Sequence, residues 1–439
     1  MVEFTEDMKK DYKILVPNML PIHFSMLEKV FRSHGYNLVV LNNEGQRVVD
    51  EGLKLVHNDT CYPALLVIGQ LIDALKSGKY DVNKTALMIT QTGGGCRASN
   101  YIHLLRKALV KAGYEQVPVI SLNASGLEKN SGFKYTLQML KESLAVVAYG
   151  DLLMLLDNQV KPYEVNKGES KALVETWIEK LSHEMINEKG YSLRKIKENL
   201  NKISQSFAEI EIVKTPKVKV GIVGEIYVKY SSFGNNHLEE FLYDEDCEVM
   251  VPGLLGFLMY CVENGVIDAA LYGGKYIKSK GSKLINELLI KIENDIIDAV
   301  KKHDRFVAPT GFKHLKSLGE KVIGLGAKMG EGWLLPAEMM ELIQLGYENI
   351  ICTQPFGCLP NHIIGKGLVR KFKEIHEESN IVPIDYDPGA TKVNQENRIK
   401  LMLSVAREKL QTERLLEEHL NFTETIIDDK KLTPVEQRG

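Results

Sequence analysis

The sequence predicts an α/β protein with two parallel-sheet domains, each Rossmann-like or flavodoxin-like, with a helical insert between them and a C-terminal helix. Two regions of the chain alternate short apolar runs with amphipathic segments whose apolar residues are three and four apart. This alternation is typical of buried parallel strands joined by crossover helices. The chain has 439 residues, which is too long for one ordinary core at roughly 150 residues per domain.

The first α/β domain is expected over residues 1–130. Four apolar runs predict its strands: Lys13–Pro17, Leu38–Leu41, Ala86–Thr90 and Val117–Leu122. Helical spacing between these runs predicts three helices: Ser25–His34, Ala64–Leu75 and Tyr101–Leu109. The order of these segments favours a parallel sheet.

Residues 131–215 are expected to form the helical insert. Leu137, Leu140 and Leu144 begin an apolar face, and two further helices are predicted over Ala172–Ile186 and Leu193–Phe207. Both of these carry many Lys and Glu residues, which indicates solvated helix faces.

The second α/β domain is expected over residues 216–439. Apolar runs predict its strands: Lys217–Val228, Cys247–Val251, Lys321–Leu325, Asn349–Gln354 and Ile381–Asp385. Its predicted helices are Leu254–Asn264, Ser282–His303, Ala337–Leu345, Ile363–Lys373 and Val393–Leu416. The hydrophilic residues from Glu424 onward are expected to form a tail.

Composition excludes several classes of protein. With 55 Lys and Arg against 58 Asp and Glu, the formal charge of −3 favours neither nucleic acid nor an anionic membrane as a partner. The N-terminus is charged and lacks the apolar core of a secretory signal. The most apolar stretch, Leu144–Leu156, is interrupted by Asp151 and is shorter than the roughly 20 residues that cross a bilayer. We therefore expect a cytoplasmic protein with reduced thiols.

Six cysteines in 439 residues are too few and too scattered for a disulfide framework. Three of them, Cys247, Cys261 and Cys352, lie within apolar strands or helices and are expected to be core thiols. Cys352 is the least certain of the three, because it lies only six residues before Cys358.

The other three cysteines share a setting among Gly, Pro and polar residues at or near a predicted helix start. Cys61 lies in HNDTCYP, Cys96 in QTGGGCRASN and Cys358 in QPFGCLPNH. Helix N-termini present free N–H groups and a positive dipole end, which are expected to lower the pKa of a thiol. Three such thiolates suit a soft metal or an iron–sulfur cluster and leave one coordination position open. A packing role at each turn is the alternative.

Residues beside these cysteines are candidates for the rest of a site. Glu225 ends a predicted strand, and His57 and His362 flank two of the cysteines, so these three are candidates for proton transfer, with capping or local pairing as the alternative. The candidates for contact with a cofactor flank the proposed ligands: Thr60, Gly95, Arg97, Asn100, Gly357 and Asn361. The triple glycine 93–95 would allow close backbone approach.

Other motifs are weaker. A hydrolase with Cys and His chemistry would not explain three cysteines in one setting. Gly324–Gly330 matches a dinucleotide-binding fingerprint poorly, and the sequence contains no P-loop. The polar segment Gly330–Trp333, before a predicted helix, could form a pocket wall or a simple turn.

Six motifs together resemble the 2-hydroxyacyl-CoA dehydratase superfamily. They are HNDTCYP, QTGGGCRASNY, VGIVGEIYV, MGEGWLLPAEM, QPFGCLPNHIIGKG and IDYDPGATKVNQENRIKLM. The likeness is closest to the C-terminal region of large acyl-CoA dehydratase activase-related proteins, a lineage that includes the double-cubane cluster proteins. It extends from about Lys13 to Arg414.

The resemblance implies an iron–sulfur cluster, either 4Fe-4S or double-cubane 8Fe-9S, with Cys61, Cys96 and Cys358 as its ligands. It also implies a separate ATP-hydrolysing, cluster-bearing activase of actin/Hsp70-like fold, which delivers low-potential electrons. The expected function is then that of the electron-accepting catalytic component, a reductase or a radical 2-hydroxyacyl-CoA dehydratase. A non-catalytic cluster carrier or assembly partner is the alternative.

The resemblance further implies a homodimer, or a heterodimer with a related subunit. The activase-related proteins carry ATPase modules ahead of the matching region, and this sequence contains neither such modules nor a phosphate-binding motif. The chain itself is therefore not expected to hydrolyse ATP.

Overall fold

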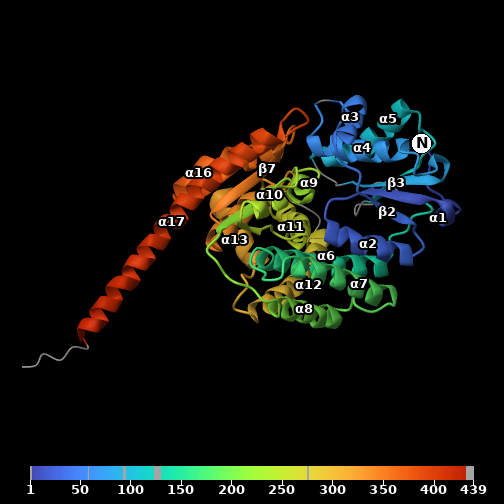
Figure 1. The fold of residues 1–439 in the computed structure, drawn as a ribbon. Coiled ribbons are helices and arrows are strands. Elements are labelled where there is room, and N and C mark those ends of the chain that lie inside the picture. Colours follow the sequence, from blue (N-terminus) through green and yellow to red (C-terminus); the bar gives the residue numbers. More distant parts are fainter. Residues whose placement is uncertain (1, 58, 92–94, 123–129, 274–275, 432–439) are drawn as a thin grey trace, which may run out of the picture.

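The computed structural model describes residues 2–57, 59–91, 95–122, 130–273 and 276–431. Within them, two four-stranded parallel sheets and many helices form a mixed α/β fold (Figure 1). The predicted fold class, two parallel sheets with intervening helices and a C-terminal helix, is confirmed.

The first sheet has the strand order β2-β1-β3-β4. Leu15 of β1 pairs with Val39 of β2 on one side and with Leu87 of β3 on the other. The strands are β1 (Lys13–Pro17), β2 (Leu38–Leu41), β3 (Thr85–Thr90) and β4 (Val119–Leu122). The helices of this region are α1 (Met8–Asp11), α2 (Pro21–Ser33), α3 (Gln46–Leu55), α4 (Tyr62–Lys76) and α5 (Tyr101–Ala112), with the short helices η1 (Val82–Lys84) and η2 (Arg97–Asn100).

The second sheet repeats this arrangement with the order β6-β5-β7-β8, so in each region the first strand lies between the second and the third. Its strands are β5 (Val218–Gly224), β6 (Cys247–Met250), β7 (Asn349–Pro355) and β8 (Asn380–Tyr386). The strand order reverses between β5 and β7, as it does between β1 and β3. In open α/β sheets, the loops at the carboxyl ends of such strands form the ligand crevice.

Long helices pack beneath both sheets in the view of Figure 1. They are α6 (Leu137–Val160), α7 (Glu169–Ile186), α8 (Leu193–Ala208), α11 (Leu254–Tyr272) and α12 (Tyr276–Lys301). One hydrophobic cluster includes residues of α2, α6, α8, α11 and α12 together with residues of both α/β regions, so the helical insert packs against both. The predicted helices at Ala172–Ile186 and Leu193–Phe207 are confirmed as α7 and α8.

Asp151 connects three parts of this layer. The backbone N–H groups of Leu254 and Leu255, at the start of α11, donate to its two carboxylate oxygens at 2.8 Å each. His23 of α2 places Nε2 3.0 Å from Asp151 Oδ1. Gly150 allows this approach, because a Cβ at that position would lie 2.4 Å from the His23 ring. One buried carboxylate on α6 thus holds α2 and α11.

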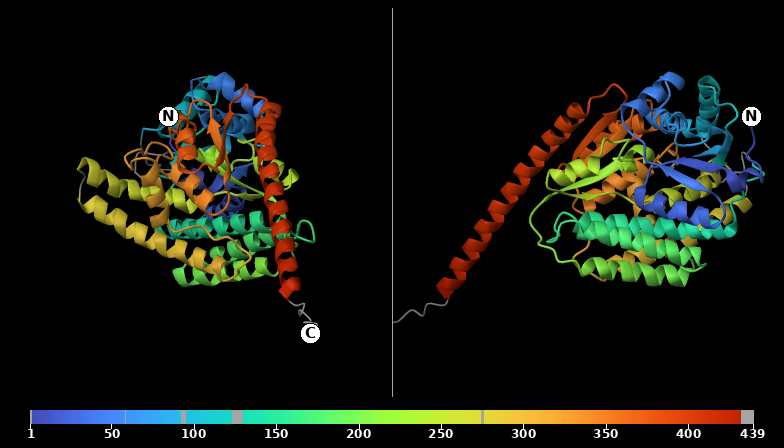
Figure 2. Two further views of the ribbon diagram at one scale, coloured as in Figure 1. Left: turned by 90° about the vertical axis from the view of Figure 1, so that its left-hand side faces the viewer. Right: turned by 45° about the vertical axis from the view of Figure 1, so that its right-hand side comes forward.

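The remaining helices belong to the second α/β region. They are α9 (Ile226–Tyr230), α10 (Leu238–Asp244), α13 (Phe312–Val322), α14 (Leu334–Gln344), α15 (Leu359–Ile364), η3 (Lys366–Leu368), α16 (Val369–Ile375) and α17 (Lys392–Lys431). Helix α17 packs on the second sheet through Ile399, Met402 and Leu403 and then extends away from the body (Figure 2).

Many boundaries differ by a few residues from the sequence prediction, and four elements differ more. The strand predicted over Lys321–Leu325 is wrong, because α13 continues to Val322 and no β-strand follows it there. The strand predicted to reach Val228 ends at Gly224, where Glu225 caps α9. Helix α17 continues to Lys431 through most of the expected tail, and the helix predicted over Ile363–Lys373 is divided among α15, η3 and α16.

Among the described residues, one helix is long and apolar enough to cross a membrane. This helix is α11, and 22% of its apolar window is buried inside the protein. Length and composition do not distinguish a membrane span from a helix of a folded soluble protein. In this structure α11 packs against α12 and α6.

Candidate functional site

Cys61 lies directly before the first turn of α4, at the helix start that its sequence setting predicts, and its side chain makes no capping hydrogen bond. Pro63 stands in the first turn of the helix, where its missing N–H leaves no bond unmade. The Cys61 side chain is buried, and its Sγ lies 2.9 Å from the hydroxyl of Tyr101 at the start of α5. The thiol therefore faces another helix start instead of solvent.

Cys96 precedes η2, which leads directly into α5. It follows β3 through a loop whose residues 92–94 lie outside the described part of the chain, so of the triple glycine only Gly95 can be placed. A Cβ at Gly95 would lie 2.6 Å from the Met329 sulfur. Glycine therefore lets this loop reach the segment before α14.

Cys358 caps α15 and follows β7 at its carboxyl end. Its Sγ accepts a hydrogen bond from Asn361 Nδ2 at 3.4 Å. Gly357 before it has φ +75°, a left-handed conformation that favours glycine. A Cβ at Gly357 would also lie 3.0 Å from the Cα of Cys61.

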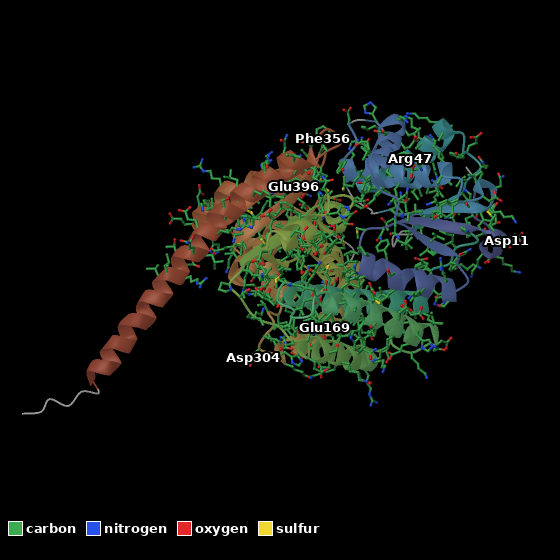
Figure 3. The ribbon with its side chains drawn as sticks, in the orientation of Figure 1. Asp11, Arg47, Glu169, Asp304, Phe356 and Glu396 are labelled. Carbon is green, nitrogen blue, oxygen red and sulfur yellow. The ribbon has the colours of Figure 1, made fainter. Side chains whose placement is uncertain are left out.

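The three cysteine segments meet although they come from both sheets. The N–H of Tyr62 donates to the carbonyl of Phe356 at 2.9 Å, which joins the Cys61 segment to the Cys358 segment. Phe356 is labelled in Figure 3, where the second α/β region faces the first. The segment of Met329 and Gly330 contacts the Cys96 segment and the Cys358 segment. Met329 lies against Gly95, and Gly330 lies against Pro360 of α15. The segments that carry the three cysteines are thus joined by these contacts.

The net shift of the thiol pKa values is upward. Burial raises the pKa of Cys61 to about 11, and it also raises the pKa of Cys96 and of Cys358. Backbone N–H groups act in the opposite direction, since Ala64 lowers the pKa of Cys61 and Ala98 lowers that of Cys96. The expectation that helix starts lower these pKa values is therefore wrong in net direction, because the cost of burying a thiolate is larger.

Two carboxylates flank the thiols. Glu225 lies at the end of β5 and accepts a hydrogen bond from Val228 N at 2.9 Å, and Glu331 accepts one from Ile226 N at 3.0 Å. Burial, followed by the Glu331 carboxylate, raises the pKa of Glu225 to about 8. Both carboxylates also raise the pKa of the Cys358 thiol. Glu225 therefore both caps α9 and acts on the thiol site.

Asn361 links one of these carboxylates to a thiol. Its Nδ2 donates to Glu331 Oε2 at 2.7 Å as well as to Cys358 Sγ. The side chain is 1% exposed, and its Oδ1 has no hydrogen-bond partner among the described residues. A buried acceptor of this kind is rare in a folded protein and is available to a bound donor group.

The structure places the other predicted residues at different distances from the thiols. Thr60 is buried beside Cys61, where its carbonyl approaches Gly357. Arg97 and Asn100 are exposed at the two ends of η2.

The two histidine candidates lie apart from this arrangement. The His57 side chain is 70% exposed and accepts a hydrogen bond from the N–H of Asp59, so it is held locally. His362 is half-buried on α15, one helical turn beyond Cys358.

Sequence reasoning did not select Glu331, Tyr101 or Lys229. Glu331 lies in the polar segment Gly330–Trp333, for which the sequence allows either a pocket wall or a simple turn. Tyr101 ends the motif that contains Cys96. A carboxylate between two glycines at a helix start was a usable signal for Glu331. Lys229 gave no such signal, because its partners come from distant parts of the chain.

The other three thiols divide differently from the prediction. Cys247 and Cys352 are buried, which confirms their core placement. Cys261 is exposed, so its expected core role is wrong. Helix α11 buries Met259, Tyr260 and Ile267, and Cys261 lies on the face that its packing neighbours leave open.

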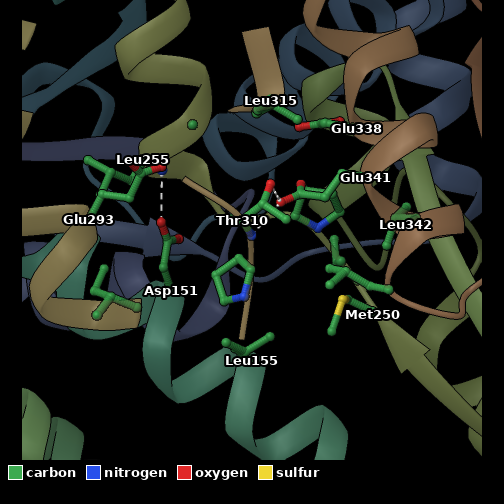
Figure 4. Close-up of a pocket in the computed structure, with 17 residues that line it drawn as sticks. Asp151, Leu155, Met250, Leu255, Glu293, Thr310, Leu315, Glu338, Glu341 and Leu342 are labelled. Carbon is green, nitrogen blue, oxygen red and sulfur yellow. Dashed lines mark hydrogen bonds between the residues drawn. The ribbon is translucent and has the colours of Figure 1, made fainter. Parts of the chain in front are cut away.

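An acidic cavity of about 90 Å³ lies between α6, α12 and α14 (Figure 4). This volume has room for several water molecules. Four carboxylates line it, those of Asp151, Glu293, Glu338 and Glu341. Thr310 and apolar side chains form the rest of the wall. The N–H and hydroxyl of Thr310 both donate to Glu341 Oε1, and the N–H of Phe312 donates to Glu293 Oε1 at 2.9 Å.

Glu293 and Glu341 make the stability of the protein fall as the pH rises. Burial raises the pKa of Glu293 and of Glu341 from 4.5 to about 7. Between pH 4.5 and about pH 7, these two groups bind more protons in the folded protein than in the unfolded chain. For each group, the free energy of unfolding therefore decreases by up to about 1.4 kcal/mol for each pH unit. Urea titrations of the wild type and of Glu341→Gln should show a smaller decrease in the variant. Equal decreases would contradict this assignment.

In the part of the chain that the structure describes, no group of three or more His, Cys, Asp and Glu side chains is arranged to hold a metal ion. The site is instead a set of three thiols and two carboxylates at the ends of five segments. Neither family models nor curated proteins match the sequence.

Proposed function

We propose that the protein is an iron–sulfur protein that accepts electrons from an ATP-hydrolysing activase and catalyses a low-potential reduction or a radical 2-hydroxyacyl-CoA dehydration. The observation that carries the proposal is the contact between the segments that hold Cys61, Cys96 and Cys358. Their segments are far apart in the chain and come from two different sheets, yet Tyr62 N and Phe356 O join two of them at 2.9 Å. Packing alone does not require a thiol at each of these helix starts.

The residues present fit such a cluster. Cys61, Cys96 and Cys358 would supply three thiolates, and their protons would be displaced on binding. The Tyr101 hydroxyl and the Asn361 amide are placed to donate hydrogen bonds to sulfur, which tunes such centres. A bound cluster would supply one-electron transfer at low potential.

Other side chains would handle the substrate and its protons. Asn361 Oδ1 is a buried acceptor without a partner among the described residues, which suits a hydroxyl or amide of a substrate. The carboxyl of Glu225 has its pKa raised to about 8 by burial and then by Glu331, so at neutral pH it holds a proton that a leaving hydroxyl needs. These roles concern binding and proton transfer.

An apolar surface beside Cys358 supports the docking of a partner protein. Phe356, Leu359 and Ile363 are between 52% and 68% exposed, and they surround the segment that carries Cys358. A cluster-bearing activase would have to approach this closely for electron transfer. We place the protein in the cytoplasm, where thiols remain reduced, as a homodimer or as a heterodimer with a related subunit.

Anaerobic purification followed by iron and acid-labile sulfide analysis tests the proposal. We expect a coloured protein with iron and sulfide in comparable amounts, whose colour fades in air. A colourless, iron-free product, also after reconstitution with iron and sulfide, would refute the cluster. A loaded protein that shows no turnover with its activase, ATP and a strong reductant would be a cluster carrier.

A further inference from the structure

Three carboxylates lie on α14 and in the turn before it. Glu338 and Glu341 are three residues apart on the helix, so they lie on one side of it. Glu331 lies in the preceding turn, near enough to Glu338 for its charge to add to burial in raising the Glu338 pKa. All three are buried. Buried carboxylates are seldom grouped in this way without a partner or a role.

The inner end of this group reaches the thiols. Glu331 Oε2 accepts the hydrogen bond of Asn361 Nδ2 at 2.7 Å, and the same Nδ2 contacts Cys358 Sγ at 3.4 Å. Glu331 Oε1 accepts from the first N–H of α9, beside Glu225. The Asn361 side chain therefore connects Glu331 to the Cys358 thiol.

Lys229 joins this group at Glu338. Its Nζ is 3.1 Å and 3.3 Å from the two oxygens of Glu338, and both side chains are 3% exposed. Lys229 comes from α9, and its positive charge partly offsets the burial that raises the pKa of Glu331 and of Glu225. The ammonium thus contacts Glu338, and its charge also acts on Glu331.

The outer end opens into the cavity. Glu341 faces it from α14 and Glu293 faces it from α12 (Figure 4). The charged groups around Glu341 are Glu293, Glu338 and His314 of α13, and Thr310 donates to it. Half-buried residues, among them Pro309, Thr310 and Leu345, line part of the cavity, so its wall reaches toward the protein surface.

We propose that Glu341, Glu338, Lys229 and Glu331 form a proton-transfer route from this cavity to the thiol site. A proton enters at Glu341 from cavity water, passes to the Glu338–Lys229 pair, and another leaves Glu331 toward the site. One proton moves inward for each electron that the site receives from a reduced iron–sulfur partner, so the buried charge stays balanced. The use of the route rests on the proposed function, whereas its existence does not.

The first experiment needs no cofactor. The purified protein is treated with the apolar reagent dicyclohexylcarbodiimide, which modifies protonated carboxyl groups, and the labelled residues are identified by mass spectrometry. We expect Glu341 to be modified near pH 6 and to lose this reactivity near pH 9, because its pKa is raised to about 7 by burial. Glu248, a buried carboxylate that accepts from the hydroxyls of Tyr163 and Tyr347, is the control and should stay unmodified. Unmodified Glu341 near pH 6 would overturn the route.

The second experiment uses the iron-loaded protein and a chemical reductant. Stopped-flow reduction in H₂O and in D₂O should show a solvent isotope effect in the wild type. Glu338→Gln and Glu341→Gln should slow the proton-coupled step by about 100-fold, as the loss of a positioned proton donor does. Glu338→Asp should restore much of the rate, and Glu248→Gln should match the wild type. Wild-type rates and isotope effects in both Gln variants would overturn the route.

The two experiments separate the two proposals. A wild-type protein that binds no iron refutes the proposed function, while the labelling of Glu341 still decides whether the carboxylate can serve as a proton carrier. Circular dichroism of each variant establishes that it is folded, and Glu338→Asp keeps the ion pair with Lys229 within reach if Glu338→Gln does not fold.

Discussion

Serine in place of Cys61, Cys96 or Cys358 is expected to remove most of the iron from the anaerobically purified protein. A serine hydroxyl is a harder ligand than a thiolate and remains protonated at neutral pH, so it replaces the thiolate poorly. Each cysteine comes from a separate segment, so no neighbouring thiol within the same loop can take its place. Iron and sulfide per chain, measured for each variant, check this expectation.

Cys247 provides the matched control for these variants. It is buried at the start of β6, and the charged groups that shift its pKa, such as Arg407 and Glu245, are not groups of the thiol site. Cys247→Ser should keep its iron. Cys261 is a poorer control, because the Glu331 carboxylate of the thiol site adds to burial in raising the pKa of its thiol. If Cys247→Ser lost as much iron as the other three, the assignment of the ligands would be wrong.

Asp151→Ala is expected to cause the largest loss of stability. The variant leaves the N–H groups of Leu254 and Leu255 at the start of α11 without their acceptor and removes the partner of His23. Removal of one member of a buried, hydrogen-bonded charged group costs about 3–5 kcal/mol. Urea denaturation followed by circular dichroism measures the change in the free energy of unfolding.

Two comparisons make this test specific. Asp151→Asn keeps one acceptor oxygen and should be less destabilising than Asp151→Ala. Asp304, labelled in Figure 3, is an exposed aspartate, and Asp304→Ala should change the free energy of unfolding by no more than about 0.5 kcal/mol. If the alanine variants at positions 151 and 304 were equally stable, Asp151 would not hold α2 and α11 together.

Much of the fold follows from local patterns in the sequence. The apolar runs at Lys13–Pro17 and Leu38–Leu41 become β1 and β2 with the same bounds, because short buried strands alternate with helices of clear helical period. The strand predicted from the run at Lys321–Leu325 is wrong, because a short apolar segment at the end of a helix has the same composition as a strand. Length and flanking residues alone could not separate these two cases.

The candidate site was predictable only where its residues are marked by local sequence. Cys61, Cys96 and Cys358 share their setting at helix starts, and that setting is what the structure contains. Glu338 and Lys229 acquire their roles through each other, across 109 residues, so a local pattern carries no sign of the pair. The thiol pKa values were misjudged because a helix start is visible in the sequence, whereas the degree of burial depends on the whole fold.

The joining of the Cys61 segment to the Cys358 segment also sets an order of events during protein synthesis. Cys61 and Cys96 leave the ribosome early, and the first sheet can fold while the rest of the chain is still being made. Cys358 follows β7, one of the last strands, so the hydrogen bond between Tyr62 and Phe356 can form only when most of the protein has been translated. Until then Cys61 and Cys96 are present in the growing chain without Cys358 beside them. Any group that needs all three can therefore be inserted only into a nearly finished chain.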